Sequence, residues 1–372
     1  MIIGVPTEIQ PNENRVAIAP SGVVALVRKG HTVLIEKNAG LGSSFSNEDY
    51  EKCGAEIVAT PKELYSRSKL ILKVKAPQLS EYNLLKKEQI LMAYLHLVAE
   101  SELTKPLQKN KITAIAFETI QKPDGSLPVL RPMSEIAGKM SVQIGAQFLE
   151  NYYGGKGLLL GGVPGTRPGK VTIIGAGNVG KNAAQVAAGY GCEVSVLDIN
   201  IDRLRYINDI MYSKVKTIVA NPITIEKEVK TADLVISAVL IPGSKPPIVI
   251  TEDMVKKMKK GSVIVDAAID QGGSVETMNR TTTHDNPTFE KHGIIHYAVS
   301  NMPGSVAKTA SIAMNNVSIP YVVSIADNGI KGVKHDSALA KGINVIDGAI
   351  TYKPVADGLF KEYTPLESII GF

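Results

Sequence analysis

The sequence predicts an α/β protein made of two doubly wound domains with a cleft between them. Three observations carry this prediction. Short apolar strands alternate with helical stretches, a second such series follows a loop rich in glycine and proline, and a glycine turn opens that second series. We expect a discontinuous first domain of residues 1–130 plus 308–372, and a second domain of residues 131–307.

The first series consists of six apolar segments with helical segments between them. This alternation predicts parallel βαβ units and a doubly wound sheet. Strands are predicted at 2–5, 33–36, 56–59, 70–75, 90–96 and 112–118, and helices at 21–29, 61–68 and 101–110. No glycine turn follows its first strand, so we do not expect this half to bind a dinucleotide.

A helix at about 134–152 and the loop 154–169 connect the two series. The second series then predicts six strands in the order 3-2-1-4-5-6. They are expected at 170–174, 192–198, 216–220, 234–240, 263–270 and 295–300. A helix at 309–326 follows, and we expect the tail to return to the first domain.

The glycine turn directly follows the strand at 170–174 and supplies Gly175, Gly177 and Gly180. The first glycine permits a tight turn, the second lets a pyrophosphate approach, and the third lets the helix pack against the strand. Asp198 ends the next strand 23 residues after Gly175, close to the about 20 expected of a ribose-binding acid. This context predicts a Rossmann-like, dinucleotide-binding domain, and a turn that binds nothing is the alternative.

Composition narrows the class of protein further. The net charge of +5 is small for 372 residues and no dense basic run occurs, so no nucleic-acid partner is expected. Two cysteines build neither a zinc site nor a disulfide framework. No apolar run is long enough for a membrane span and no secretory signal is recognised, so we expect a cytoplasmic protein without a membrane partner.

Charged side chains are expected at the carboxyl ends of the first-half strands, where ligands bind in open α/β sheets. Arg15 suits a substrate carboxylate and a lysine there suits carbonyl polarisation, although each is also typical of an exposed surface. Lys73 and Lys75 alternate on one face, and one of them is expected to be solvated. His96 is either an acid–base group or a packed histidine, and Glu118 adds a carboxylate.

The second half contributes Asp270 at the end of its fifth strand, near the expected nicotinamide ring, whereas Asp266 lies further inside. Asn301 follows the last strand. Ser134 begins a helix, where it is either an N-cap or a cofactor contact. These residues predict an NAD-dependent oxidoreductase acting on a small anionic substrate, and they do not identify the substrate.

The sequence resembles the bacterial L-alanine dehydrogenases along essentially its whole length. The matching segments are GVPTE at 4–8, NRVA at 14–17, LKVKAP at 72–77, YLHL at 94–97, MSE at 133–135, the glycine turn, LDIN at 197–200, DAAIDQGG at 266–273 and NMP at 301–303. The resemblance implies reversible, NAD-dependent oxidative deamination of L-alanine to pyruvate and ammonia by a homohexamer.

The resemblance also implies residue roles. Arg15 would hold the substrate carboxylate and Lys75 would hydrogen-bond the reacting centre, while His96 and Asp270 would be the catalytic groups that manage protons. The implied NAD contacts are Ser134, Gly175, Gly177, Asn178, Val179, Gly180, Asp198, Arg203, Val239, Leu240, Ala267, Ala268, Ile269, Asp270, Arg280, Asn301 and Met302.

Two departures from relatives bear on the ligands. Ala220 stands where some relatives have a serine near the adenine, which puts that contact in doubt. Ser324 and Asn328 stand where a metal proposed for certain relatives would need a carboxylate and an imidazole, so no metal is expected.

Two other functions remain as alternatives. The soluble NAD-binding component of a proton-translocating transhydrogenase shares the fold and several motifs, but a transmembrane extension is absent from this sequence while Lys75 and His96 are present. A non-catalytic NAD-binding regulator would not require a cation, an imidazole and a carboxylate at its strand ends.

Overall fold

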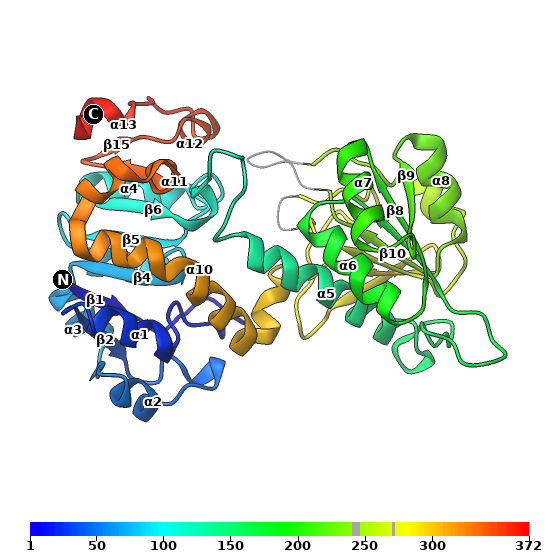
Figure 1. Ribbon diagram of the computed structural model, residues 1–372, viewed down its shortest axis with the longest axis horizontal. Coiled ribbons are helices and arrows are strands. Elements are labelled where there is room, and N and C mark those ends of the chain that lie inside the picture. The colour runs from blue at the N-terminus through cyan, green and yellow to red at the C-terminus, as the bar shows by residue number, and fades with distance from the viewer. Residues whose placement is uncertain (240–245, 270–271, 372) are drawn as a thin grey trace. The chain divides into compact units, whose positions relative to one another are not determined.

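The computed structural model describes residues 1–239, 246–269 and 272–371. They form two compact units, and each unit contains its own sheet. Unit 1 comprises Met1–Met133 and Gly304–Phe372, and unit 2 comprises Ser134–Pro303 (Figure 1). The predicted fold class of two doubly wound α/β domains is confirmed.

Among the described residues, unit 1 has an eight-stranded sheet in the order β15-β14-β6-β5-β4-β1-β2-β3. Strands β1 to β6 are mutually parallel, as the alternation of strands and helices predicts. The strands are β1 Ile2–Val5, β2 Thr32–Glu36, β3 Glu56–Val58, β4 Leu70–Lys75, β5 Ile90–Tyr94, β6 Thr113–Ala116, β14 Ile343–Ile346 and β15 Ala349–Ile350.

Helices cover this sheet, and its central strands are therefore almost entirely buried. Leu72 on β4 and Leu91 on β5 have no exposed surface, which explains why β5 reads as a continuous apolar run and why β4 is apolar up to Lys73. The helices are α1 Pro20–Val27, α2 Asn47–Lys52, α3 Pro61–Arg67, α4 Thr104–Lys109, α10 Ala307–Asn328, α11 Ser337–Gly342, α12 Lys353–Gly358 and α13 Leu366–Ile370.

The C-terminal segment completes the sheet of unit 1. Strand β14 pairs antiparallel with β6, and β15 pairs antiparallel with β14. Figure 1 shows the orange α10 beside the blue α1, and Asn315 on α10 accepts the backbone N–H of Ala19 at 3.1 Å. The two antiparallel strands were not predicted, because four- and two-residue segments give no detectable periodicity.

Unit 2 has a sheet in the order β12-β13-β11-β10-β7-β8-β9, as far as its residues are described. The predicted order 3-2-1-4-5-6 is confirmed for its six parallel strands. Antiparallel β12 was missed, because its hairpin with β13 is too short to read from the sequence. The strands are β7 Lys170–Ile174, β8 Glu193–Asp198, β9 Lys216–Val219, β10 Leu234–Ser237, β11 Val263–Asp266, β12 Thr288–Lys291 and β13 Ile294–Tyr297.

The helices of unit 2 are α6 Asn178–Gly189, α7 Ile201–Ile210, α8 Pro222–Thr231 and α9 Glu252–Lys256. The predicted N-cap at Ser134 is wrong, because helix α5 spans Arg131–Phe148 and Ser134 is its fourth residue. Proline is tolerated in the first turn of a helix, where its missing N–H would have no partner anyway, so Pro132 does not delay the start of α5.

Several predicted strands are longer than the observed ones at their carboxyl ends. Strand β5 ends at Tyr94 before His96, and Glu118 lies in the 3₁₀ helix Phe117–Thr119 rather than on β6. After β5, the carboxylate of Glu118 accepts the backbone N–H groups of Leu95 and His96.

Candidate active site

Arg15 is held in the loop after β1 by a carboxylate two residues earlier. The Nε and Nη2 atoms of Arg15 donate to the two oxygens of Glu13 at 2.7 and 2.5 Å, and Nη1 donates to Met133 Sδ at 3.3 Å. Both charged side chains are almost fully buried. Burial disfavours the charge on Arg15, but its hydrogen bonds to the Glu13 carboxylate and the attraction of that charge outweigh burial and raise the pKa of the guanidinium. Arg15 is therefore a permanent, oriented cation.

The structure assigns different environments to Lys73 and Lys75. Lys73 is 1% exposed and pairs with Glu8 and Glu81, whereas Lys75 is half-buried at the end of β4. The pairing of β4 with β5 shifts register between Leu72 and Lys75. This bulge breaks the regular two-residue repeat that would place Lys73 and Lys75 on the same face of the strand. Neither lysine is fully solvated, and only Lys75 lies at the edge where a ligand would bind.

His96 follows β5 in a left-handed backbone conformation, with φ +43°. Glu118 holds this turn, because its two oxygens accept the backbone N–H groups of His96 at 2.7 Å and of Leu95 at 3.1 Å. The imidazole itself is 45% exposed, and its Nδ1 lies 3.9 Å from Glu118. A left-handed histidine is uncommon, and such strain collects at functional sites. Its exposure argues against the alternative of a packed core histidine.

Tyr94, the last residue of β5, lies two residues before His96 and contacts its side chain. Its ring stacks on the imidazole with centroids 6.4 Å apart, and its hydroxyl donates to Val129 O at 2.7 Å. Burial raises the pKa of the Tyr94 phenol, and the nearby Arg15 only partly opposes this. Tyr94 is therefore a neutral support for the imidazole, and neither it nor Glu13 was identified from the sequence as a site residue.

The glycine turn in unit 2 has the three geometries that a bound pyrophosphate requires. Gly175 has φ +105°, and a Cβ there would lie 2.5 Å from Ala238 O. A Cβ on Gly180 would overlap with Gly175 O, so the third glycine allows α6 to pack on β7. A Cβ on Gly177 would meet nothing within 4 Å, so the turn is open where a phosphate would approach. These residues fit a dinucleotide.

Asp198 connects the end of β8 to this turn. Its Oδ2 accepts the N–H of Ala176 at 2.6 Å and its Oδ1 accepts that of Asn200 at 2.8 Å. Arg203 lies 3.8 Å away and is mostly exposed. An ionised carboxylate accepts about four hydrogen bonds, so Asp198 has capacity for about two more besides these backbone groups. Asn178 and Val179 are the first two residues of α6, directly after its N-cap Gly177.

Further predicted cofactor contacts follow β10 and β11. Val239 follows β10 and packs against the core of unit 2, while Ala267 donates its N–H to Ser237 O at 2.9 Å. Ala268 and Ile269 are buried. Asp266 is occupied by backbone groups, since it accepts from Ala268 N at 2.9 Å and from Ser274 N at 2.8 Å. These two contacts connect the end of β11 to the segment that follows it.

The remaining predicted contacts come from later segments of unit 2. The Arg280 guanidinium lies 4.7 Å above the Phe289 ring, Asn301 has a left-handed backbone with φ +58°, and Met302 is buried. Asp270 and Leu240 lie outside the described residues. Of the predicted catalytic and substrate-binding residues, the structure therefore places Lys75 at the end of β4, and Arg15 and His96 in the segments that follow β1 and β5.

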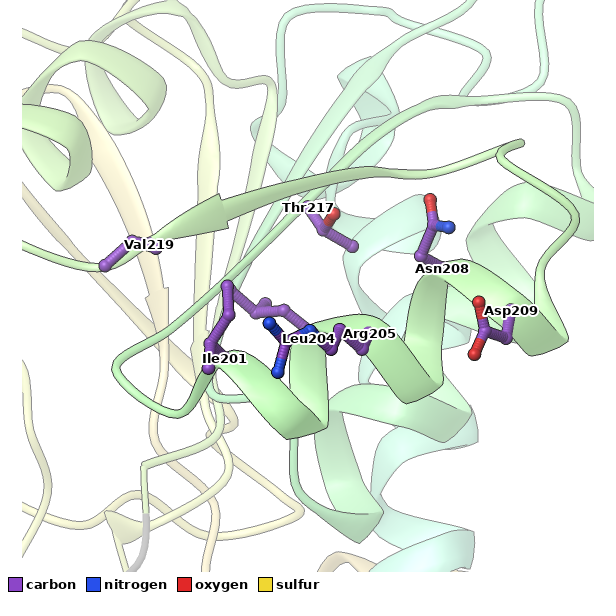
Figure 2. Close-up of a pocket in the computed structure, with 7 residues that line it drawn as sticks. All are labelled: Ile201, Leu204, Arg205, Asn208, Asp209, Thr217 and Val219. Carbon is purple, nitrogen blue, oxygen red and sulfur yellow. The ribbon is translucent and has the colours of Figure 1, made fainter.

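A separate hollow of about 340 Å³ lies between α7 and β9 (Figure 2). Its walls come from Ile201, Leu204, Arg205, Asn208, Asp209, Thr217 and Val219. None of these seven is a predicted site residue. Within the described ranges, no group of three metal-ligating side chains occurs, and no helix is both long and apolar enough to cross a membrane.

Comparison with known proteins assigns the chain to a family. Residues 4–137 match the model of the alanine dehydrogenase/PNT N-terminal domain, and residues 141–353 match that of the alanine dehydrogenase/PNT C-terminal domain. The chain belongs to the alanine dehydrogenase/PNT family.

Within this family, the chain is 55% identical to an alanine dehydrogenase of Methanococcus maripaludis, and the match covers 100% of both chains. It is 54% identical to an alanine dehydrogenase of Bacillus subtilis, with 100% and 98% covered. A solved L-alanine dehydrogenase matches with a TM-score of 0.94 at 49% identity, covering 96% of this chain and 99% of the other. A transhydrogenase of Sinorhizobium meliloti shares the fold, with a TM-score of 0.83 at 24% identity and 94% and 100% covered.

Proposed function

We propose that this chain catalyses the reversible oxidative deamination of L-alanine to pyruvate and ammonia with NAD as the cofactor. The observation that carries the proposal is the identity above 50% to alanine dehydrogenases along the whole chain. The geometry supports it, since the same edge of unit 1 holds an oriented guanidinium, a half-buried ammonium and an exposed imidazole.

Recognition of the substrate is proposed for Arg15 and Lys75. The guanidinium of Arg15 binds the carboxylate, because its planar fork forms charge-assisted hydrogen bonds in a fixed direction. Glu13 fixes the plane of the fork by occupying Nε and Nη2 at 2.7 and 2.5 Å. Lys75 hydrogen-bonds the α-nitrogen or α-oxygen and stabilises negative charge that develops on oxygen.

Proton transfer is proposed for His96, whose imidazole is 45% exposed. When bound, NAD would supply the acceptor for the hydride of the substrate Cα. Loss of that hydride, together with one proton of the substrate ammonium, converts alanine to an iminium; water adds to its carbon, and ammonia leaves to give pyruvate. His96 exchanges protons with the substrate during these steps, a contribution of about 10²–10⁴ in rate. Asp270 is proposed as the second catalytic group.

Binding of NAD is proposed for unit 2. The open space at Gly177 and the backbone N–H groups of Asn178 and Val179 receive the pyrophosphate. Asp198 accepts hydrogen bonds from the ribose hydroxyls and repels a 2′-phosphate, which favours NAD over NADP. The further NAD contacts named from the sequence, including Ser134, Arg280 and Asn301, are proposals of the same kind.

The proposed reaction is tested by NADH formation from L-alanine. We expect NADH to form only when NAD and L-alanine are both present, and to be consumed with pyruvate and ammonia. No turnover with L-alanine would refute the function. Equal kcat/KM values for NAD and NADP would refute the assigned role of Asp198 while leaving the reaction intact.

We also propose a cytoplasmic homohexamer, a proposal that rests on the resemblance to the L-alanine dehydrogenases. Sedimentation velocity measures the assembly, and a monomer or dimer at micromolar concentration would contradict it. A transhydrogenase component shares the fold, but its match is 24% identical, against 49% for the solved L-alanine dehydrogenase.

A further inference from the structure

A buried cluster of charges lies next to Lys75 and takes no part in the proposed chemistry. The Nζ atom of Lys73 lies 3.3 Å from Glu8 Oε2 and 2.9 Å from Glu81 Oε1. The three side chains are 1%, 3% and 6% exposed. Tyr65 adds a fourth buried group, because its hydroxyl donates to Glu81 Oε1 at 2.8 Å.

Stability alone does not account for this cluster. The free energy lost when two charges are removed from water can exceed the free energy gained from their attraction. Replacing a buried ion pair with apolar residues is therefore often neutral or stabilising. Burial opposes the charge on Lys73, but Glu8 and Glu81 together raise the pKa of its ammonium. Lys73 therefore keeps its positive charge. The other groups that Glu8 and Glu81 bind indicate what the cluster does.

Each carboxylate uses its second oxygen to bind the backbone close to Lys75. Glu8 Oε1 accepts the N–H of Val74 at 2.6 Å, one residue before Lys75. Glu81 Oε2 accepts the N–H of Gln78 at 2.8 Å, three residues after Lys75. Segment 74–78 is thus fixed on both sides of Lys75 by two carboxylates that share one buried ammonium.

The first of these contacts lies at the bulge in β4. Register moves from Leu72 opposite Met92 to Lys75 opposite Tyr94, so β4 has one more residue than β5 over this interval. A bulge leaves backbone groups without ladder partners and changes the direction of the side chains that follow. Glu8 supplies an acceptor for the N–H of Val74 at this point.

We propose that the Glu8–Lys73–Glu81 cluster positions Lys75 for the substrate by clamping the segment that carries it. The inference rests on the proposed role of Lys75. Glu8, Lys73 and Glu81 are positioning residues, because they act on the substrate only through the backbone of β4. Their loss should therefore affect pyruvate and alanine and leave the cofactor unaffected.

The test compares Glu8→Ala, Glu8→Gln and Glu81→Gln. Alanine removes both contacts of Glu8, and we expect kcat/KM for pyruvate to fall about ten- to a hundredfold, mainly through KM. Glutamine at position 8 still accepts the Val74 N–H, so it should restore most of that loss. Glu81 serves three donors, the Lys73 ammonium, the Tyr65 hydroxyl and the Gln78 N–H, and glutamine at position 81 offers them a single acceptor oxygen, so a loss of roughly three- to tenfold is expected.

The readouts are the KM for pyruvate and for L-alanine, the Kd of NADH by fluorescence, and the melting temperature. Asp233→Asn is the matched control, because it removes a partly buried carboxylate that binds Lys156 at 2.5 Å just before β10 in unit 2. We expect this control to lower the melting temperature and leave every KM unchanged.

Opposite results would overturn the inference. If Glu8→Ala and Glu81→Gln lower the melting temperature but keep both KM values within twofold of the unmutated protein, the cluster is merely structural. Should Glu8→Ala fail to fold, Glu81→Gln decides by the same criterion. An unmutated protein without alanine turnover would refute the proposed function instead, so the two failures are distinguishable.

Discussion

Replacing Gly177 with alanine should separate cofactor binding from folding. Gly177 has φ −74° and ψ −165°, which alanine adopts without strain, and a Cβ there would meet nothing within 4 Å. The substitution reduces the conformational entropy of the unfolded chain, which stabilises the folded protein by about 0.4–1 kcal/mol. Because Gly177 is the N-cap of α6, where alanine is less favourable, a cost of similar size opposes this gain. The free energy of unfolding should change by less than about 1 kcal/mol.

The same methyl group should impair binding of NADH severely. It would occupy the space where the backbone approaches the pyrophosphate. Losing even one charge-assisted hydrogen bond to a phosphate costs about 1.5–3 kcal/mol, which raises Kd about ten- to a hundredfold. Gly177→Ala should therefore fold normally and bind NADH weakly.

Gly180→Ala is the matched contrast in the same turn. Its Cβ would overlap with Gly175 O and lie 3.2 Å from Ile173 Cγ2, so α6 must move away from β7. Overpacking of this kind costs about 1–3 kcal/mol or more. Urea denaturation followed by circular dichroism measures stability, and NADH fluorescence titration measures affinity. The reasoning is refuted if Gly177→Ala binds NADH as the unmutated protein does, or if it is destabilised more than Gly180→Ala.

Three further predictions concern the two units separately. His96→Ala should lower kcat about 10²–10⁴-fold with NADH binding unchanged, and near-normal turnover would remove His96 from the mechanism. Arg15→Lys should raise the KM for pyruvate about ten- to a hundredfold, because an ammonium cannot keep both contacts to Glu13 and also offer a planar fork to the substrate. An unchanged KM for pyruvate together with a loss of NADH binding would contradict this prediction. Burial lowers the pKa of His296 to about 4, so the unfolded state binds more protons below about pH 6.5, and stability should fall from there toward pH 4. Urea denaturation at pH 7 and pH 5 should show a smaller pH dependence in His296→Gln, and an equal dependence would exclude His296 as its source.

The glycine turn shows how much of unit 2 follows from local sequence. The motif consists of a strand, three spaced glycines, a helix and an acid 23 residues after the first glycine. Each part depends only on residues close in the sequence, so the six-stranded order could be predicted. Strand β12 could not, because a four-residue antiparallel partner depends on the hairpin it forms with β13.

The substrate edge of unit 1 shows the limit of such reasoning. The topology places Arg15, Lys75 and His96 at or just after the carboxyl ends of β1, β4 and β5, and the strand order alone predicts this. Which lysine is buried was not predictable, because the bulge that separates Lys73 from Lys75 appears only when β4 pairs with β5.

The sequence by itself determined the fold class, the dinucleotide turn and the residues that reach the strand ends, because these depend on periodicity and on contacts between near neighbours. Only the tertiary structure decided how those residues are held. The carboxylate of Glu8 accepts the N–H of Val74, 66 residues away in the sequence, at 2.6 Å. The carboxylate of Glu118 accepts the N–H of His96, 22 residues away, at 2.7 Å. Hydrogen bonds between such distant residues leave no periodic pattern in the sequence, because only the folded chain brings their partners together.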